Sequence, residues 1–357
     1  MTETSADEFS ILVIRLGALG DVANTLRAVY ALRETVPGLR VDWLVESGSR
    51  DLVELSGVAD RIILFPRKRL SHLFRRPWLW PAGCVEMLRF LRKELRTTRY
   101  DAALDFQGNL KSGLLSLFTR AGVHVGFARG HCREMNWLFN NVLATPAKKR
   151  LPRAEKFAAL AQVVEPELKL GDVSLPENPE AAARVREFLD TILPGEGPLV
   201  ILHPGTSDFG AFKRWPAEKF GAVAAALQRS RGARCVVTQG PGEEDLAESV
   251  AAASEGAAKK APLMPLPQLV ELLRQADLMI AGDTGPLHIA ALLQRPLVGI
   301  FAAKDPVVYA PYGTRCEIVR ADVECSPCTK RRCDDLRCVH RIGTEMVLDA
   351  AEKMLGE

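Results

Sequence analysis

The chain has 357 residues, of which 47% are hydrophobic and 25% charged, and its formal net charge is +3. This length favours two domains, and the composition is that of an ordinary globular protein. The small net charge gives no reason to expect a nucleic-acid-binding protein, and no apolar run is long enough to predict a membrane span. The first residues, MTETSADEFS, are polar and acidic, so we expect no signal peptide and a cytoplasmic location.

Short apolar runs alternate with longer segments of helical periodicity, which is the pattern of parallel sheets with crossover helices. We predict strands near residues 11–15, 40–45, 61–65, 101–105, 123–127, 234–238, 277–281 and 297–301, with a further strand in PLVILHPG. We predict helices near residues 22–36, 84–97, 109–120, 153–164, 216–230, 243–253, 266–275 and 285–293. The stretch EPELKLGDVSLPENPE, rich in proline, glycine and acidic residues, reads as a linker. These patterns predict an α/β protein of two doubly wound, Rossmann-like domains that face a ligand cleft.

The first predicted strand belongs to the stretch ILVIRLGALGDV, which reads as a strand, a glycine turn and the start of a helix. The spacing G-x-x-G-D differs from the G-x-G-x-x-G of dinucleotide-binding proteins. Asp21 would repel a phosphate at this turn, but it could accept a proton from an attacking hydroxyl. The alternative is that Asp21 only caps the helix.

The segment DFQGNLKSG repeats this layout after the strand near residues 101–105. Gln107, Asn109 and Lys111 follow the strand end and could bind a polar or acidic acceptor. They could equally satisfy the local backbone.

The most informative stretch of the second half is LMIAGDTGPLHIAALL. Asp283, Thr284 and Gly285 form a turn after a strand, and Pro286 suits the first turn of a helix. The free N–H groups of that helix start, together with the Thr284 hydroxyl, could hold an anion, with His288 one turn further on. A plain capped helix is the alternative.

Two further turns follow neighbouring strands. In HPGTSDFGAFKRWP, Thr206 and Ser207 offer hydroxyls, and Lys213 could neutralise a diphosphate or be a solvated surface lysine. In VVTQGPGEEDLAE, Glu243 or Glu244 could accept hydrogen bonds from a ribose, or could only favour the helix dipole. Together the three turns predict a nucleoside-diphosphate site.

Residues 67–99 hold ten Lys and Arg against Glu86 and Glu94. Apolar and aromatic residues, among them Trp78 and Trp80, lie between the cations. This combination suits an anionic membrane surface or a phosphorylated lipid, and the alternative is a solvated basic helix face.

Eight cysteines without a signal peptide favour thiols or metal ligands over disulfides. Four of them lie close together in CSPCTKRRCDDLRC, as Cys325, Cys328, Cys333 and Cys338. Their spacing could hold a structural zinc or iron ion, or the four could be reduced thiols that close a loop.

The motifs IRLGALGDV, DFQGNLKSG, HPGTSDFGAFKRWP, GDTGPLHIAA and the four cysteines occur in an order that resembles the lipopolysaccharide heptosyltransferases of glycosyltransferase family 9. The cysteine tail is similar to that of heptosyltransferase II enzymes. The resemblance implies a GT-B fold, an inverting transfer of heptose from ADP-heptose to the Kdo or heptose inner core of lipopolysaccharide, and no cofactor for catalysis. It also implies a peripheral protein at the inner face of a Gram-negative inner membrane, as a monomer or weak oligomer without nucleic acid.

On this resemblance, residues 1–175 form the acceptor-binding domain and residues 176–342 the nucleotide-sugar-binding domain. Residues 343–357 form a C-terminal helix that could pack back on the first domain. Asp21 resembles the general base and Lys213 the diphosphate partner. The implied donor-binding residues are Thr206, Ser207, Glu243, Glu244, Asp283, Thr284, Gly285, Pro286 and His288, and the implied acceptor-binding residues are Gly20, Gln107, Asn109 and Lys111. Competing interpretations are a transferase of another nucleotide sugar, a nucleotide-sugar epimerase or hydrolase, and a non-catalytic nucleotide-binding protein.

Overall fold

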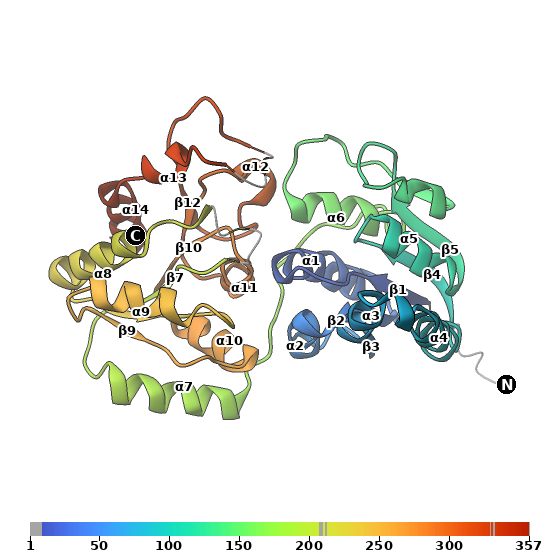
Figure 1. Ribbon diagram of the computed structural model, residues 1–357, viewed down its shortest axis with the longest axis horizontal. Coiled ribbons are helices and arrows are strands. Elements are labelled where there is room, and N and C mark those ends of the chain that lie inside the picture. The colour runs from blue at the N-terminus through green and yellow to red at the C-terminus, as the bar shows by residue number, and fades with distance from the viewer. Residues whose placement is uncertain (1–8, 207–209, 211–212, 329, 331–332, 357) are drawn as a thin grey trace. The chain divides into compact units, whose positions relative to one another are not determined.

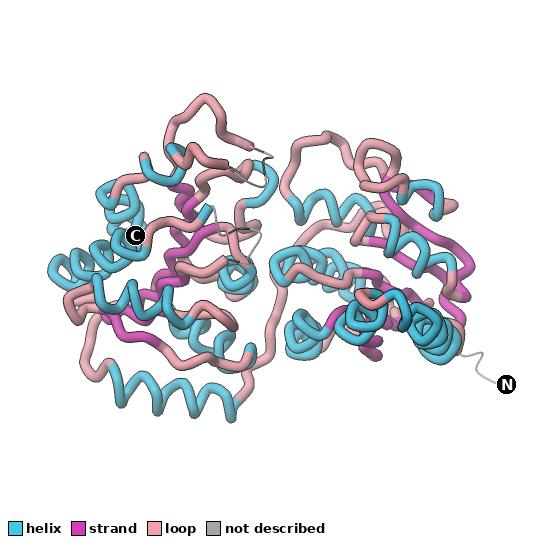
Figure 2. The backbone as a smooth tube through the Cα atoms, in the orientation of Figure 1, coloured by secondary structure: helices cyan, strands magenta, loops and turns pink. Residues whose placement is uncertain are grey.

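The structure is a computed structural model that describes residues 9–206, 210, 213–328, 330 and 333–356. The chain divides into two compact units, residues 1–173 and 174–357. Each unit is built on one six-stranded sheet, and every strand pair in both sheets is parallel. Figures 1 and 2 show helices packed against the strands of each unit. This is the doubly wound architecture that the alternating pattern predicts.

The first unit has the strand order β3-β2-β1-β4-β5-β6. Its strands are β1 (Ser10–Ile14), β2 (Arg40–Glu46), β3 (Arg61–Phe65), β4 (Arg99–Asp105), β5 (Arg120–Phe127) and β6 (Val142–Ala144). Its helices are α1 (Leu19–Thr35), α2 (Ser47–Ser56), α3 (Arg67–Phe74), α4 (Trp80–Phe90), α5 (Leu110–Leu117) and α6 (Arg153–Ala161). Short helical turns add η1 (Pro77–Leu79), η2 (Leu91–Leu95) and η3 (Asn136–Phe139).

The second unit has the strand order β12-β11-β10-β7-β8-β9. Its strands are β7 (Leu199–His203), β8 (Arg234–Val237), β9 (Ala258–Lys260), β10 (Leu278–Gly282), β11 (Leu297–Ile300) and β12 (Cys316–Val319). Its helices are α7 (Pro179–Ile192), α8 (Ala217–Arg231), α9 (Glu244–Ala253), α10 (Leu266–Gln275), α11 (Gly285–Leu292), α12 (Pro306–Tyr309), α13 (Arg337–His340) and α14 (Thr344–Gly356).

The central strands are buried on both faces, as crossover helices require of a parallel sheet. The middle residues of β1 and β10, from Ile11 to Ile14 and from Leu278 to Ala281, are fully buried. Each sheet has its own hydrophobic core: Leu12, Ile14 and Phe90 belong to the core of the first unit. The carboxyl ends of these strands therefore open onto the loops that carry the polar motifs.

The C-terminal helix α14 packs on α8 and on strands β11 and β12 of its own unit. Packing of residues 343–357 on the first domain was only one possibility from the sequence. Within the second unit, the buried residues Val347, Ala351 and Met354 of α14 belong to the hydrophobic core.

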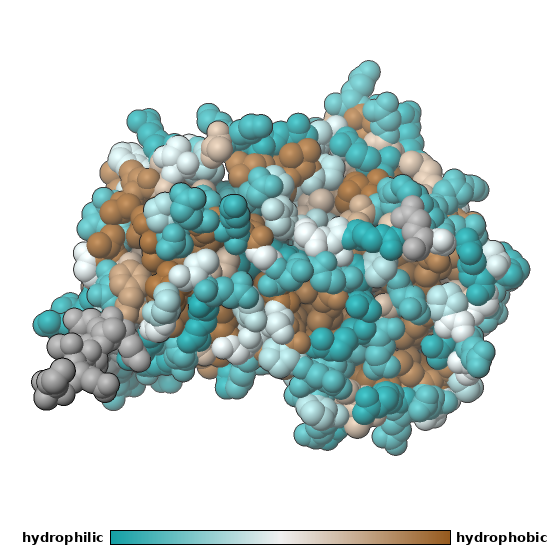
Figure 3. Space-filling view, turned by 180° about the vertical axis from the view of Figure 1, so that it is seen from behind, coloured by the Kyte–Doolittle hydropathy of each residue, from teal (hydrophilic) through white to brown (hydrophobic). Residues whose placement is uncertain are grey.

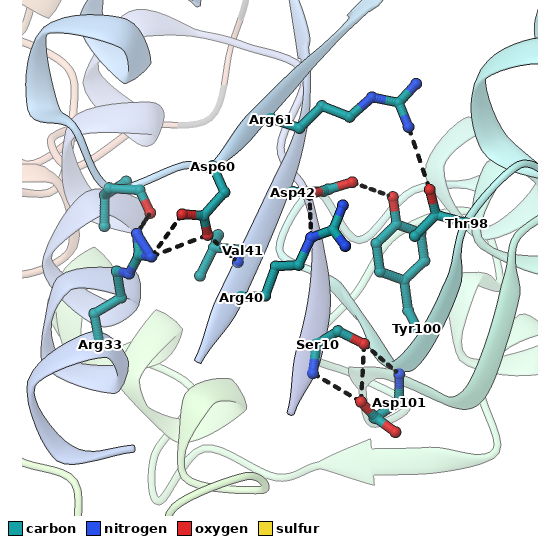
Figure 4. Close-up of polar contacts among 11 residues, drawn as sticks. Ser10, Arg33, Arg40, Val41, Asp42, Asp60, Arg61, Thr98, Tyr100 and Asp101 are labelled. Atoms are coloured by element: carbon teal, nitrogen blue, oxygen red, sulfur yellow. Dashed lines mark hydrogen bonds and ion pairs between the residues drawn. The ribbon is translucent and has the colours of Figure 1, made fainter. Parts of the chain in front are cut away.

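The amino ends of the strands in the first sheet carry polar contacts that fix strand positions (Figure 4). The Asp101 carboxylate at the start of β4 accepts hydrogen bonds from the backbone N–H and hydroxyl of Ser10, at 2.7 and 2.8 Å. The Tyr100 hydroxyl donates to the buried Asp42 at 2.6 Å, and burial together with this carboxylate raises the pKa of Tyr100. These contacts lie at the strand ends opposite to the polar motifs and serve the sheet.

The face seen in Figure 3 is largely hydrophilic, with groups of apolar side chains between the polar ones. In the part of the chain that the structure describes, no helix combines the length and hydrophobicity that crossing a membrane requires.

Candidate active site

Asp21 lies in the first turn of α1, beyond the carboxyl end of β1, as the motif predicts. Its carboxylate pairs with the guanidinium groups of Arg15 and Arg153. The second pair joins Oδ1 of Asp21 to Nε of Arg153 at 3.2 Å. Arg153 comes from the start of α6, and α6 packs on α1. Two cations from different elements therefore fix the orientation of a carboxylate that remains 27% exposed.

Arg15 is the buried member of this cluster. Its side chain donates a hydrogen bond to the carbonyl of Phe106 at 2.9 Å. Burial lowers the pKa of Arg15, and the charge of Asp21 opposes that shift. The sequence pattern predicts Arg15 only as the end of a strand, and no motif includes Arg153. A cation next to the aspartate motif was the available signal for Arg15, whereas Arg153 lies more than a hundred residues away in the chain.

A pocket of about 470 Å³ opens beside Asp21. Gln107 and Lys111, two of the predicted acceptor residues, line it together with Glu46 and Arg67. The Glu46 carboxylate holds the Lys111 ammonium at 2.9 Å and the Arg67 guanidinium at 2.7 Å. Neither Glu46 nor Arg67 was expected to belong to this site. The pocket thus presents both donors and acceptors, as the hydroxyls and carboxylates of a sugar acid would require.

Asn109, also a predicted acceptor residue, has a structural role. Its side chain accepts a hydrogen bond from the backbone N–H of Ser112 at 3.0 Å, and Ser112 returns the bond in a capping box that begins α5. Gly20 lies in the first turn of α1 and contributes backbone only.

The buried Asp105 organises the loop between β4 and α5. Its carboxylate accepts hydrogen bonds from the N–H groups of Gln107 and Gly108, the hydroxyl of Ser112 and the amide of Asn136. Burial raises the pKa of Asp105, and these donors oppose the shift. Asp105 holds the loop on which Gln107 and Lys111 stand.

In the second unit, Lys213 and His288 meet at Asp283. The Lys213 ammonium lies 2.6 Å from one carboxylate oxygen, and Nε2 of His288 lies 3.9 Å from the other. Burial of Asp283 opposes ionisation, but His288 and Lys213 outweigh it and hold the pKa of this carboxyl well below its usual range. Three residues that the sequence placed in two separate motifs therefore form one charged cluster.

The N-terminus of α11 lies next to this cluster, with Gly285 and Pro286 as its first residues. Thr284 occupies the N-cap position, but its side chain makes no capping hydrogen bond. Its hydroxyl is buried and has no hydrogen-bond partner among the described residues. A buried hydroxyl and the free N–H groups of a helix start are together suited to a phosphate oxygen.

Arg214 joins Thr206 to Glu243, although the sequence motif predicts a role only for the neighbouring Lys213. Arg214 donates to the Thr206 hydroxyl at 3.2 Å and to the Thr206 carbonyl at 2.6 Å, and it lies 3.4 Å from the Glu243 carboxylate. Glu243 also accepts a hydrogen bond from the Gly240 N–H at 2.8 Å. Glu244 is exposed, and its carboxylate accepts a hydrogen bond from the nearby Gly242 N–H at 3.4 Å.

The turn after β7 approaches Glu243 closely. A Cβ atom at Gly205 would lie 1.9 Å from a carboxylate oxygen of Glu243, so a larger residue there would force the Glu243 side chain to move. Ser207, a predicted donor residue of the same turn, lies outside the described residues.

The cysteine cluster holds no metal site that the structure supports. Cys325, Cys328, Cys333 and Cys338 are free thiols. Across residues 9–206, 210, 213–328, 330 and 333–356, no three His, Cys, Asp or Glu side chains are placed to hold a metal ion. The predicted structural zinc or iron is therefore not supported, because the cysteine spacing alone does not bring the four sulfur atoms around one point.

Comparison with known proteins gives consistent results. Residues 88–338 match the model of glycosyltransferase family 9 (heptosyltransferase). The lipopolysaccharide heptosyltransferase 1 of Pseudomonas aeruginosa is 30% identical over 90% of this chain and 87% of its own length. That of Escherichia coli K12 is 29% identical over 88% of this chain and 94% of its own length. The lipooligosaccharide heptosyltransferase 2 of Haemophilus influenzae is 25% identical, so these matches do not favour the heptosyltransferase II type that the cysteine tail suggested.

Solved structures agree on the fold. The E. coli heptosyltransferase WaaC with ADP superposes with a TM-score of 0.75 at 22% identity, covering 97% of this chain and 100% of that chain. The E. coli ADP-heptose lipopolysaccharide heptosyltransferase II gives a TM-score of 0.73 at 21% identity, covering 97% and 98%. Two Rossmann-like units, each with a polar site at the carboxyl ends of its parallel strands, have the architecture of the GT-B fold that these structures share. Within that class, the chain belongs to glycosyltransferase family 9.

Proposed function

We propose that this enzyme transfers heptose from ADP-heptose to the Kdo or heptose inner core of lipopolysaccharide. The observation that carries the proposal is the similarity, along nearly nine-tenths of the chain, to curated lipopolysaccharide heptosyltransferases at 29% and 30% identity. The names of these relatives specify lipopolysaccharide, which is a membrane lipid. We therefore propose that the enzyme works at the inner face of a Gram-negative inner membrane. We also propose that it is a monomer or weak oligomer.

The second unit is proposed to bind the donor. The unpartnered Thr284 hydroxyl and the start of α11 would receive the diphosphate oxygens, and Lys213 would neutralise their charge. Asp283 keeps the Lys213 ammonium at 2.6 Å until a diphosphate competes for it. We assign the ribose hydroxyls to Glu243 rather than Glu244, because Glu243 lies in the turn beside Thr206 and Gly205.

The first unit is proposed to bind the acceptor in the pocket beside Asp21, with Lys111 and Gln107 as its partners. In the reaction, the acceptor oxygen forms a bond to the anomeric carbon while the bond from that carbon to the ADP oxygen breaks. The electron pair leaves with ADP, and the hydroxyl proton goes to the Asp21 carboxylate. One displacement of this kind inverts the anomeric centre. Arg15 and Arg153 hold Asp21 in place, and Lys213 stabilises the departing diphosphate.

The test measures ADP release from ADP-heptose with Kdo-lipid A, with a heptosylated core and without acceptor. For Asp21→Asn we expect the acceptor-dependent rate to fall by about 10²- to 10⁴-fold, the usual contribution of a general base. Asp51→Asn is the matched control, because Asp51 is an exposed aspartate on the neighbouring helix α2. Release that needs no acceptor would point to a hydrolase. Release from another nucleotide sugar alone would reassign the donor, and an unaffected Asp21→Asn would remove the base.

A further inference from the structure

An apolar groove of about 390 Å³ lies in the first unit, between the α4–η2 segment and α5. Met87 and Leu91 form one wall, and Leu110, Leu114 and Phe118 form the other. Only Lys111, among the groove residues, also lines the pocket beside Asp21. The groove is therefore a second feature, adjacent to the proposed acceptor site.

Large apolar side chains continue outward from the groove. Leu88 on α4 is 49% exposed, and Leu117 on α5 is 51% exposed. Met135 and Leu138 extend the surface over η3, which packs on α5, with exposures of 65% and 56%. We call these residues and the groove the α4–α5 surface. A run of exposed apolar residues over three adjacent elements normally marks an interaction site.

Exposed cations lie on or next to the elements that pack against α4. Lys68, Arg75 and Arg76 on and after α3, and Arg92 and Lys93 on η2, are all exposed. None of these five cations has an ion-pair partner among the described residues. Arg92 follows Leu88 by four positions, which places a cation on the same helix face as an exposed leucine.

Trp78 in η1, just before α4, adds a third kind of residue. It is 74% exposed. Exposed tryptophan beside basic side chains and an apolar stripe is the composition of surfaces that lie in the headgroup region of a bilayer.

We propose that the α4–α5 surface docks the enzyme on an anionic lipid bilayer, with apolar side chains entering the acyl boundary and the cations contacting lipid phosphates. Charge complementarity favours this occupant over a second copy of the chain, because an isologous contact would bring the unpaired cations near one another. The inference rests on the proposed function only for its purpose, which is to bring a lipid-borne acceptor to the pocket beside Asp21.

The test is flotation of the purified full chain with vesicles of phosphatidylglycerol and phosphatidylethanolamine, compared with vesicles of phosphatidylcholine. We expect partitioning onto the anionic vesicles to be at least about tenfold stronger, because each cation near an anionic surface contributes about fivefold. Strong binding that is equal on both vesicle types, or no binding to either, would overturn the proposal.

Two variants locate the contact. Leu88→Ser/Leu114→Ser is expected to weaken partitioning by about tenfold or more. Its control is Leu263→Ser/Val307→Ser, which changes residues of the second unit with similar exposure: 48% and 44%, against 49% and 42%. Arg92→Gln/Lys93→Gln should also weaken binding by about tenfold, whereas Arg186→Gln/Arg229→Gln, on exposed positions of α7 and α8, should not. Equal losses in the controls would overturn the location.

Two further readouts separate the membrane-docking proposal from the proposed function and from dimer formation. Turnover of a water-soluble, deacylated acceptor should be unchanged in Leu88→Ser/Leu114→Ser, while turnover of vesicle-bound acceptor falls. If no heptose transfer occurs at all, the proposed function fails, but the vesicle partitioning still decides the docking surface. Sedimentation velocity that shows a dimer dissociated by Leu88→Ser/Leu114→Ser, without vesicle binding, would assign the surface to a second copy instead.

Discussion

At Thr284, the contribution of one hydroxyl to ligand binding can be measured apart from its contribution to folding. It occupies the N-cap of α11, yet its buried oxygen makes no hydrogen bond with any described residue. Such a group costs stability unless a ligand satisfies it. Valine has nearly the same shape as threonine and removes the unsatisfied oxygen.

Thr284→Val is therefore expected to weaken ADP binding by about tenfold or more, the usual value of a hydrogen bond to a charged group, without lowering the free energy of unfolding. Isothermal titration with ADP and chemical denaturation measure the two quantities. The control is Thr238→Val, whose buried hydroxyl lies 3.0 Å from His203 and which should lower stability by about 1 kcal/mol. A Thr284→Val protein that is destabilised but binds ADP normally would show that the hydroxyl serves the fold.

His203 at the end of β7 gives a pH-dependent signature. Burial lowers its pKa to about 4, so the folded state favours the neutral ring, whereas the unfolded state titrates near 6.5. The unfolded chain binds more protons between these values, so this stabilisation is fully present above about pH 6.5 and is lost as the pH falls toward 4.

Between pH 7 and pH 5, His203 should contribute a loss of about 2 kcal/mol in the free energy of unfolding. Denaturation of wild type and His203→Gln at both pH values measures it, because the difference between the two proteins removes the contribution of other histidines. A loss of equal size in His203→Gln would contradict the assignment.

Glu243 and Glu244 mark the limit of sequence reasoning at the residue scale. Adjacent residues at a helix start point in directions about 100° apart, so only one of them can face the turn. The sequence left the choice open, because it depends on the path of the backbone after β8. The motifs place Lys213 and Asp283 in the predicted site separately. The ion pair between them joins residues 70 positions apart, so no local pattern predicts it.

At the scale of elements, the apolar runs are sufficient to predict the buried strands. The predicted strands at 40–45, 61–65 and 297–301 agree with β2, β3 and β11 within a residue or two. The edge strands β6, β9 and β12 were missed, because they are short and, as in the AKK of β9, partly polar. Helix α7 was also missed: its first residues fall in the stretch read as a linker, although Asn178 and Pro179 are an N-cap and a first helical residue.

Helix α5 provides a prediction at this scale. The sequence predicts Asn109 as an acceptor contact, and the structure shows it as the N-cap of α5. Asn109→Ala should lower the free energy of unfolding by about 1 kcal/mol, because it removes the hydrogen bond at 3.0 Å to Ser112 N–H. Asn109→Ser should retain most of the stability, because serine caps helices equally well. Chemical denaturation gives both values. If Asn109→Ser is as unstable as Asn109→Ala, the cap does not explain the residue. If it is stable but has a higher KM for acceptor, Asn109 also binds acceptor.

At the scale of the whole molecule, two domains could be predicted from length and from the repeated strand–glycine–helix opening. The expected boundary between residues 175 and 176 lies close to the division between residues 173 and 174 that the structure gives. The α4–α5 surface could be predicted only in part. The basic and aromatic residues of 67–99 are contiguous in sequence, but the leucines of α5 and η3 join them only through tertiary packing.

Because each unit has its own core, we expect the donor nucleotide to stabilise one unit more than the other. A ligand at one hundred times its Kd stabilises the state that binds it by about 2.7 kcal/mol. With the donor site in the second unit, ADP should slow hydrogen exchange in β7 and β10 by up to about 100-fold and leave β1 and β4 nearly unchanged. Hydrogen exchange of the full chain with and without ADP measures this. Lys213→Met is the informative variant, because it removes the cation and leaves Asp283 to repel the diphosphate, so the protection should disappear at the same ADP concentration. Protection centred on β1 and β4 would place the nucleotide in the first unit and reverse the assignment of donor and acceptor.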